Sequence, residues 1–389
     1  DYRTYQWNLF SDAAISGLEE ADLLLSPGVR MSCGHMVLSG QSARRNVFAA
    51  NGATVSVAGE FNSLFGAGNV AQFQGVYLTN GTEFVVTGGS SQQGAAGRTN
   101  VFVVADSKFS SKAFTLKGGH DFATFDHALV DFTGTVQLQE GKDVRASFVN
   151  GTVVTNLCTS GDSFDIGTAN GVYTTAVQVV DSDIRFSRHI GVGNVNASAR
   201  TVFALTNSVF QKLIGYDNNY LYVRGDALID LYNSTCRVAT VQAGNADAAK
   251  KTAPKIHLAG KSSLTTDATN AYLGKDDNAE LLMEGESDFA VSGASLYLGG
   301  DTSKGNAKAY TTAPTGTLTV AGRATYRCLG ARTAVGHLPG TYGVLNVRDE
   351  ATVSPGKLQI GRYGTGIVNV EGGTITALGK MEDALFFEK

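Results

Sequence analysis

Short strands recur along the chain, and each ends just before a residue that tolerates a tight turn. The apolar residues lie two and four positions before a Gly, Asn or Asp, as Phe102 and Val104 do before Asp106. Side chains two positions apart share one face of a strand, and Gly, Asn and Asp accept a left-handed backbone. A pattern that recurs about every 26 residues is typical of a solenoid. The predicted turn positions are Gly59, Asn80, Asp106, Gly134, Asn150, Asp181, Asn207, Gly225, Gly260, Gly285, Gly322, Asp349 and Gly372.

Each repeat in the most regular part of the chain contains three strands. It reads as a strand, a turn, a second strand, a loop, and a third strand that ends in Leu, Ile or Val before a glycine. The third-strand glycines are Gly274, Gly299, Gly336 and Gly361. We therefore predict an all-β fold, a single-stranded right-handed parallel β-helix of roughly 12–13 coils stacked ~4.8 Å apart. A β-sandwich would instead show hairpin turns about every 8–12 residues and no long-range period.

The two ends of the chain differ from the repeat. Residues 1–28 are predicted to form an N-terminal capping or assembly segment, because an open solenoid end exposes unpaired strand edges. The β-helix is then expected to occupy residues 29–389. Residues 385–387 are expected to form either a buried lid or an adhesive end. The candidate contacts for association with a neighbouring molecule are Tyr2, Tyr5, Trp7, Phe10, Leu385, Phe386 and Phe387.

Composition and charge exclude several classes of partner. The chain contains 47 Gly and only 5 Pro, which fits a turn-rich β protein. The formal net charge is −4 and no Lys/Arg cluster is longer than a pair, so we expect no nucleic-acid partner. No apolar run reaches the ~18 residues that predict a membrane span. The chain starts at Asp1 without a Met or an export signal, so we expect a chain that was processed or cut, with any export signal removed.

Few residues suggest chemistry, and most acidic pairs coincide with the turns. Asp181 and Asp349, for example, are turn residues, where the backbone conformation already explains an Asp. His257 lies between Ile256 and Leu258 and is expected on the outward face of its strand. We predict no catalytic residue and no cofactor. Calcium at the Asp/Asn-rich loops 216–219 and 275–278 is the alternative, because calcium prefers oxygen ligands.

His120 and His127 belong to the one local cluster of His and Asp residues. The apolar segment between them favours a buried strand, in which the two rings point to opposite faces. A metal site there would need a turn between the two histidines. The four scattered cysteines lack zinc-site spacing and are expected to be small core residues, with one disulfide between adjacent coils as the alternative.

The last repeats carry a family resemblance. Residues 343–378 read GVLNVRDEATVSPGKLQIGRYGTGIVNVEGGTITAL. This stretch resembles the β-helical repeats of bacterial autotransporter passengers and related exported surface proteins, and the likeness continues more loosely back to about residue 254. The resemblance implies a secreted or cell-surface bacterial β-solenoid. It names no ligand and no activity.

These observations favour a non-catalytic structural or adhesive solenoid. Its expected partners are further copies bound through the solenoid ends, giving a filament, or other surface proteins or glycans. The first alternative is a polysaccharide-degrading enzyme, a lyase or glycosidase, which requires two facing carboxylates on neighbouring coils. A trimeric protein similar to a phage tail fibre is the second alternative.

Overall fold

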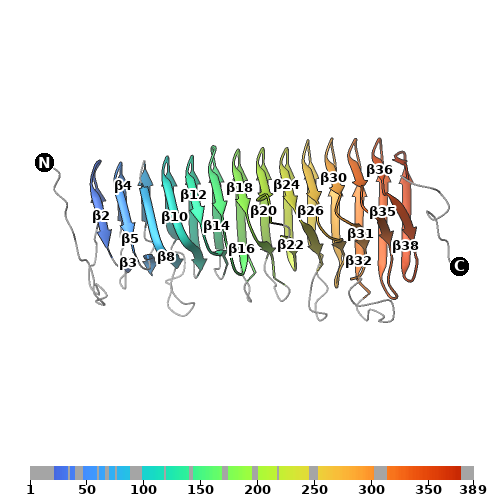
Figure 1. Ribbon diagram of the computed structural model, residues 1–389, viewed down its shortest axis with the longest axis horizontal. Helices are drawn as coiled ribbons and strands as arrows, with labels where there is room; N and C mark the ends of the chain where they lie inside the picture. Colours follow the sequence, from blue (N-terminus) through green and yellow to red (C-terminus); the bar gives the residue numbers. More distant parts are fainter. Residues whose placement is uncertain are drawn as a thin grey trace. The chain divides into compact units, whose positions relative to one another are not determined.

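The computed structural model describes residues 22–33, 36–39, 47–58, 61–65, 70–74, 77–87, 99–117, 120–139, 143–168, 174–194, 200–216, 219–244, 253–301 and 313–377. The chain forms two compact units, Asp1–Arg188 and His189–Lys389. Both units consist of parallel strands stacked coil upon coil, so the predicted all-β solenoid is confirmed (Figure 1). No helix occurs among the described residues, and hence none there that could cross a membrane.

In the first unit, successive coils add strands to three parallel stacks. The first stack consists of β1 (Asp22–Leu25), β4 (Val47–Asn51), β7 (Val70–Gln74), β9 (Thr99–Ala105), β11 (His120–Asp126), β14 (Asp143–Val149) and β17 (Thr174–Val180). The second consists of β2 (Arg30–Cys33), β5 (Thr54–Val57), β12 (Leu129–Phe132), β15 (Val153–Asn156) and β18 (Asp183–Phe186). The third consists of β3 (Met36–Ser39), β6 (Phe61–Phe65), β13 (Val136–Leu138) and β16 (Asp162–Ile166). Two long strands, β8 (Tyr77–Thr87) and β10 (Lys108–Lys117), run through both the second and third stacks.

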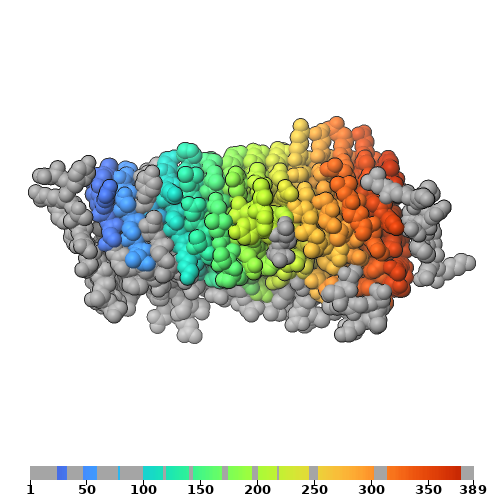
Figure 2. Space-filling model, in the orientation of Figure 1, coloured from blue at the N-terminus to red at the C-terminus, as the bar shows by residue number. Residues whose placement is uncertain are grey.

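The second unit repeats the same three stacks. The first stack consists of β20 (Arg200–Thr206), β23 (Asp226–Tyr232), β26 (Lys255–Ala259), β29 (Ala279–Met283), β32 (Thr315–Val320), β35 (Tyr342–Arg348) and β38 (Thr365–Glu371). The second consists of β21 (Val209–Lys212), β24 (Thr235–Val238), β27 (Ser263–Thr266), β30 (Asp288–Val291), β33 (Thr325–Cys328), β36 (Thr352–Ser354) and β39 (Thr374–Ile375). The third consists of β19 (His189–Val192), β22 (Tyr220–Val223), β25 (Thr240–Ala243), β28 (Ala271–Leu273), β31 (Ser295–Leu298), β34 (Arg332–Val335) and β37 (Lys357–Ile360). A space-filling view shows the coils of each unit as successive bands of colour, blue to green and then green to red (Figure 2).

Alternation along each strand builds the core. In β11 every second residue is buried, and the intervening residues are half-buried on the outward side. Parallel in-register pairing places equivalent residues of neighbouring coils next to each other, as with Phe102, Ala123 and Ala146. A strand with period two therefore yields a continuous inward ladder and a separate outward ladder.

Phenylalanine dominates the core of the first unit. The ring of Phe125 stacks on Phe148, with centroids 5.0 Å apart and planes 3° from parallel. It also meets Phe102 edge-on at 5.8 Å and Phe114 at 5.5 Å. All four rings are at most 1 % exposed. Aromatic pairs in these geometries contribute roughly 0.5–1.5 kcal/mol each beyond the burial of their area.

Most predicted turn positions lie just after a first-stack strand and have a left-handed backbone. They are, with φ in parentheses, Asp106 (46°), Asn150 (54°), Asp181 (50°), Asn207 (49°), Gly260 (64°), Gly285 (68°), Gly322 (65°), Asp349 (56°) and Gly372 (96°). The side chain of the turn residue also bonds to the neighbouring coil in places. The Asp349 carboxylate, for example, accepts a hydrogen bond from the Gly322 backbone N–H at 2.9 Å.

Three predicted positions belong to other corners of the coil. Gly134 lies between β12 and β13, and Gly225 lies between β22 and β23. Asn80 lies inside β8, where pairing passes from β5 to β6. Gly134 and Gly225 therefore lie at turns between strands, as predicted, although not at the turn that follows a first-stack strand. The prediction is wrong for Asn80, which continues a strand. Short apolar strands precede all three positions, and the local spacing does not tell them apart. Gly59 lies outside the described residues.

The sequence pattern missed the turn at Gly52, which follows β4 and has φ of 59°. It also missed the turns at His127 and Asn233. Their φ values are 48° and 49°, and they follow β11 and β23 directly. His127 thus occupies the turn between Asp106 and Asn150, where the pattern predicts Gly134. Apolar residues lie two and four positions before each of these two residues, as Phe125 and Ala123 do before His127. Histidine and asparagine are among the non-glycine residues enriched in this conformation.

The solenoid begins earlier than predicted. Strand β1 (Asp22–Leu25) pairs in parallel with β4 and is the first described strand of the first stack. The boundary expected at residue 29 therefore falls within the first coil. The run Leu23–Leu25 therefore belongs to the stack and not to the predicted capping segment.

The predicted third-strand glycines form a close corner in the second unit. Gly336 has φ of 69°, and its backbone N lies only 2.2 Å from where a Cβ on Gly343 would be. Gly299 and Gly316 approach each other in the same way, with a corresponding distance of 2.5 Å. Backbone therefore packs on backbone at this corner, with no room for a side chain.

Candidate functional site

The last described coil exposes core positions. Val370 of β38 is in register with Val347 of β35 and Val320 of β32. Val347 and Val320 are 0 % exposed, whereas Val370 is 52 % exposed. Among the described strands, β38 pairs only with β35, so its other edge has no described partner. The candidate assembly residues Tyr2, Tyr5, Trp7, Phe10, Leu385, Phe386 and Phe387 all lie outside the described residues.

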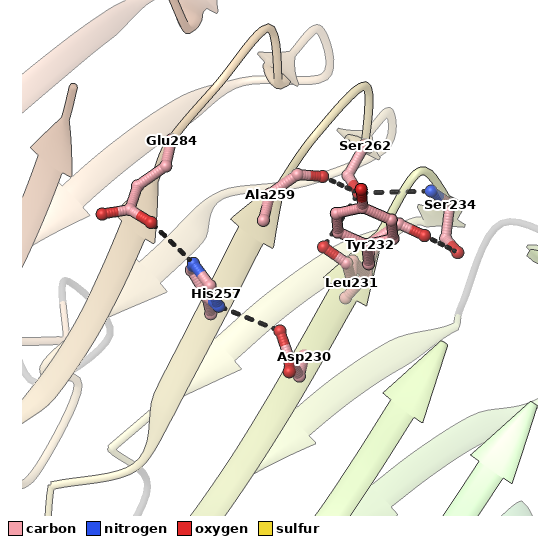
Figure 3. Close-up of polar contacts among 8 residues, drawn as sticks. All are labelled: Asp230, Leu231, Tyr232, Ser234, His257, Ala259, Ser262 and Glu284. Atoms are coloured by element: carbon pink, nitrogen blue, oxygen red, sulfur yellow. Dashed lines mark hydrogen bonds and ion pairs between the residues drawn. The ribbon is translucent and has the colours of Figure 1, made fainter. Parts of the chain in front are cut away.

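A histidine between two carboxylates lies on the outward side of the first stack (Figure 3). His257 Nδ1 lies 2.9 Å from Asp230 Oδ1, and His257 Nε2 lies 3.3 Å from Glu284 Oε2. The three residues come from β23, β26 and the turn after β29, so each belongs to a different coil. The His257 side chain is 29 % exposed, which agrees with its predicted outward position. Parallel register alone brings Asp230 next to His257.

The imidazole fills the space between these two carboxylates. Glycoside hydrolysis needs the sugar or a water between its two acids, roughly 5–9.5 Å apart. Here each ring nitrogen faces one acid (Figure 3). The nearby Ser262 hydroxyl is turned to the backbone carbonyls of Ala259 and Leu231, at 2.7 and 2.9 Å. This arrangement links three coils through side-chain contacts and does not resemble the geometry of a glycosidase.

The other histidine and acid candidates make contacts between neighbouring coils. His120 and His127 stand at opposite ends of β11, as the apolar segment between them predicted. His127 Nδ1 lies 2.6 Å from Asp106 Oδ1, and His120 Nδ1 lies 3.8 Å from Asp143 Oδ2. The described residues contain no group of three or more His, Cys, Asp or Glu suited to a metal ion.

The structure describes one of the two loops predicted as calcium candidates completely and the other in part. In the loop 275–278, Asp277 Oδ1 accepts the Asn278 N–H at 2.8 Å, and backbone bonds to Gly244 hold the turn. The loop 216–219 is described only at its ends, and calcium remains a prediction.

Three cysteines, Cys158, Cys236 and Cys328, are buried free thiols. Burial raises the pKa of the Cys236 thiol to about 12.

A row of aromatic side chains covers the outward side of the third stack in the second unit. Tyr272 and Tyr297 are in register on β28 and β31, and their rings stack with centroids 5.5 Å apart. Tyr297 meets His337 at 5.2 Å, and His337 meets Tyr363 at 6.1 Å. Tyr272, Tyr297 and His337 are only 6–8 % exposed, although the two tyrosines lie on the outward side of their strands.

His337 has an unusual environment for a residue outside the core. It follows β34 directly after Gly336, and its Nδ1 is buried with no hydrogen-bond partner among the described residues. Burial, then the positive charges of Arg362 and Arg332, lower the pKa of the imidazole to about 4. Both effects disfavour the protonated ring. His337 is therefore neutral at pH 7.

Acidification is expected to destabilise the protein through His337. The unfolded chain takes up the proton near pH 6.5 and the folded chain only near pH 4, so the free energy of unfolding falls as pH drops through this window. The full pKa difference corresponds to at most ~3 kcal/mol, and solvent screening around the arginines reduces it to roughly 1–2 kcal/mol. Urea unfolding at pH 7 and pH 4.5 measures the loss. A loss of equal size in His337→Gln would show that other groups cause it.

Sequence reasoning did not single out His337, Arg332 or Arg362. The histidine was noted only as isolated, and the two arginines had no local motif. A usable signal was present, because His337 follows one of the repeated third-strand glycines and Tyr363 follows another by two positions. Equivalent positions in adjacent coils lie side by side, so these residues were bound to be neighbours.

Comparison with protein-family models, curated proteins and solved structures finds no match for this chain.

Proposed function

We propose that this protein is a non-catalytic structural and adhesive solenoid of a bacterial surface, and that it assembles end to end. The observation that carries the proposal is the last described coil, where the core position Val370 is 52 % exposed. The resemblance of residues 343–378 to exported bacterial β-helices supports the location outside the cell. The proposed occupant of the open end is the first coil of a second copy.

Strand β38 offers both a strand edge for hydrogen bonding and an apolar surface for packing. The edge of β38 that has no described partner can pair with another strand, as open strand edges generally do, while Val370 supplies apolar area. A polar ladder also ends there: the Asn346 amide donates to Thr319 at 3.1 Å, and the Asn369 amide donates to Asn346 at 2.9 Å. A further coil would continue all of these ladders. Because the two ends differ, the contact is heterologous and repeats into a fibre.

Val370→Lys is expected to abolish end-to-end association. An isolated molecule can leave the ammonium in water at this open end, but an added coil would bury it without a partner. Ile367→Lys on the same strand is the matched control, because Ile367 is 44 % exposed and alternates with Val368 and Val370 along β38. Sedimentation velocity at increasing concentration, with electron microscopy, should show oligomers for wild type and Ile367→Lys, and monomers for Val370→Lys. A wild type that stays monomeric throughout would refute the assembly.

A further inference from the structure

A patch of positive charge lies on the outward side of the third stack at the end of the second unit. Arg332 on β34 is in register with Lys357 on β37, and Arg362 follows β37 by two residues. Arg362 lies over the ring of Tyr363, 4.9 Å from its centroid. Its charge and that of Arg332 both act on His337. The charged groups that affect the pKa of the imidazole are therefore positive.

The floor of this patch is a small residue. Ala334 lies in register between Tyr297 and Gln359, where a larger side chain would continue the outward ladder. The side-chain Oε1 of Gln359 accepts a hydrogen bond from Arg332 Nη1 at 3.1 Å. Tyr297 and Gln359 thus flank Ala334, and Arg332 is anchored beside it through Gln359. The rim is more open, because Tyr363 is 43 % exposed.

Two buried nitrogen atoms in this patch lack partners. Arg332 Nε and His337 Nδ1 are both buried and have no hydrogen-bond partner among the described residues. A buried unpaired donor costs about 1–3 kcal/mol, so such atoms are usually explained by a bound water, ion or ligand. Arg332 Nε can only donate, and neutral His337 can donate from Nδ1 in one tautomer. The group missing at Arg332 Nε is therefore an acceptor, and the same group can accept from His337 Nδ1 in that tautomer.

We propose that Arg332, Arg362 and His337 bind the carboxylate of a small ligand such as an acidic monosaccharide. A guanidinium presents its N–H groups in a planar fork that matches a carboxylate, and a negative charge balances the local excess of cations. The bound carboxylate accepts hydrogen bonds from Arg332 Nε and His337 Nδ1, with Arg362 and Lys357 at the rim. The site lies on the third stack and does not depend on the end-to-end assembly.

Binding should be linked to proton uptake by His337. The free imidazole is neutral at pH 7 because burial and the charges of Arg362 and Arg332 oppose protonation, while Tyr297 and Tyr363 are uncharged neighbours. A bound carboxylate raises the pKa of the ring, so the complex holds more of the proton than the free protein does. Affinity therefore rises as pH falls from 7 to 5, where a carboxylate is still largely ionised.

Isothermal titration calorimetry of the full chain with glucuronate, acetate and glucose tests the proposal. Glucuronate should bind saturably, acetate more weakly, and glucose not at all, because it has the sugar ring without the carboxylate. Glucuronate affinity should increase about threefold to tenfold between pH 7 and pH 5. If glucose binds as well as glucuronate, or if glucuronate does not bind, the site is not a carboxylate site.

Variants then locate the site. Arg332→Gln should weaken glucuronate binding at least tenfold, and His337→Gln should remove its pH dependence. Arg327→Gln is the matched control from the same coil, since Arg327 already pairs with Asp288 at 2.7 Å and should bind as wild type does. Circular dichroism melting confirms that each variant is folded, and Arg362→Gln replaces Arg332→Gln if the latter is not. Equal binding by wild type and a folded Arg332→Gln or Arg362→Gln variant would overturn the assignment.

Discussion

Phe125→Ala is expected to lower the free energy of unfolding by ~3–5 kcal/mol. The ring is fully buried and contacts Phe102, Phe114 and Phe148 within 6 Å. Its removal loses the burial of a large apolar surface, opens a cavity between coils and breaks several aromatic pairs. The parallel ladder fixes the spacing of the backbone on either side, so the neighbouring rings cannot close the gap. Urea unfolding monitored by circular dichroism measures the effect.

Phe122→Ala is the control for this change. Phe122 lies on the same strand, β11, but on the outward side, where Arg145 lies 5.0 Å from its ring centroid. Removing it should cost roughly 1 kcal/mol, because the half-buried ring lies outside the inward stack and takes part in one cation–π contact. Similar losses for both variants would mean that the inward ring stack does not dominate the stability of the first unit.

Gly343→Ala is expected to destabilise the second unit by roughly 3 kcal/mol, at the upper end for overpacking. An added Cβ would lie 2.2 Å from the Gly336 backbone N and 2.6 Å from the Leu298 carbonyl oxygen. Both obstacles are backbone atoms held by pairing between coils, so no side-chain rotation relieves the clash. Thermal unfolding followed by circular dichroism should show the lower stability.

Gly215→Ala separates crowding from backbone conformation. Gly215 has φ of 86°, but a Cβ there would meet no atom within 4 Å. Its replacement costs only the strain of a left-handed alanine, roughly 1–2 kcal/mol. If Gly215→Ala proved as damaging as Gly343→Ala, the close approach of coils at the Gly336 corner would not be the cause.

The local sequence pattern predicted a turn correctly where the residue type alone explains the left-handed backbone. Asp106, Asn150 and Asp181 follow apolar pairs and adopt left-handed backbone because their side chains tolerate it. Gly134 and Gly225 satisfy the same local pattern at other corners. A short apolar strand precedes every corner of a three-stranded coil, so only the pairing between coils decides which corner a turn residue occupies.

The candidate sites could not be predicted from the local sequence pattern, for a different reason. Asp230, His257 and Glu284 are about 27 residues apart in succession, and nothing in their own neighbourhoods links them; the register of parallel coils brings them together. His337 and Arg332 are close in sequence, but their unpaired buried nitrogens become evident only when the surrounding side chains are in place. The two-residue alternation of apolar and polar positions likewise does not predict that an outward-facing side chain is buried.

The sequence alone determined the all-β solenoid, its three-stranded coil and most of its first turns, because period-two alternation and turn residues act over a few positions. Only the tertiary structure decided which corner each turn occupies, that Asp22–Leu25 belongs to the stack, that Val370 is open to solvent, and that Arg332 and His337 share a patch. Those properties depend on the register between coils, which lies in contacts about one repeat apart in the chain.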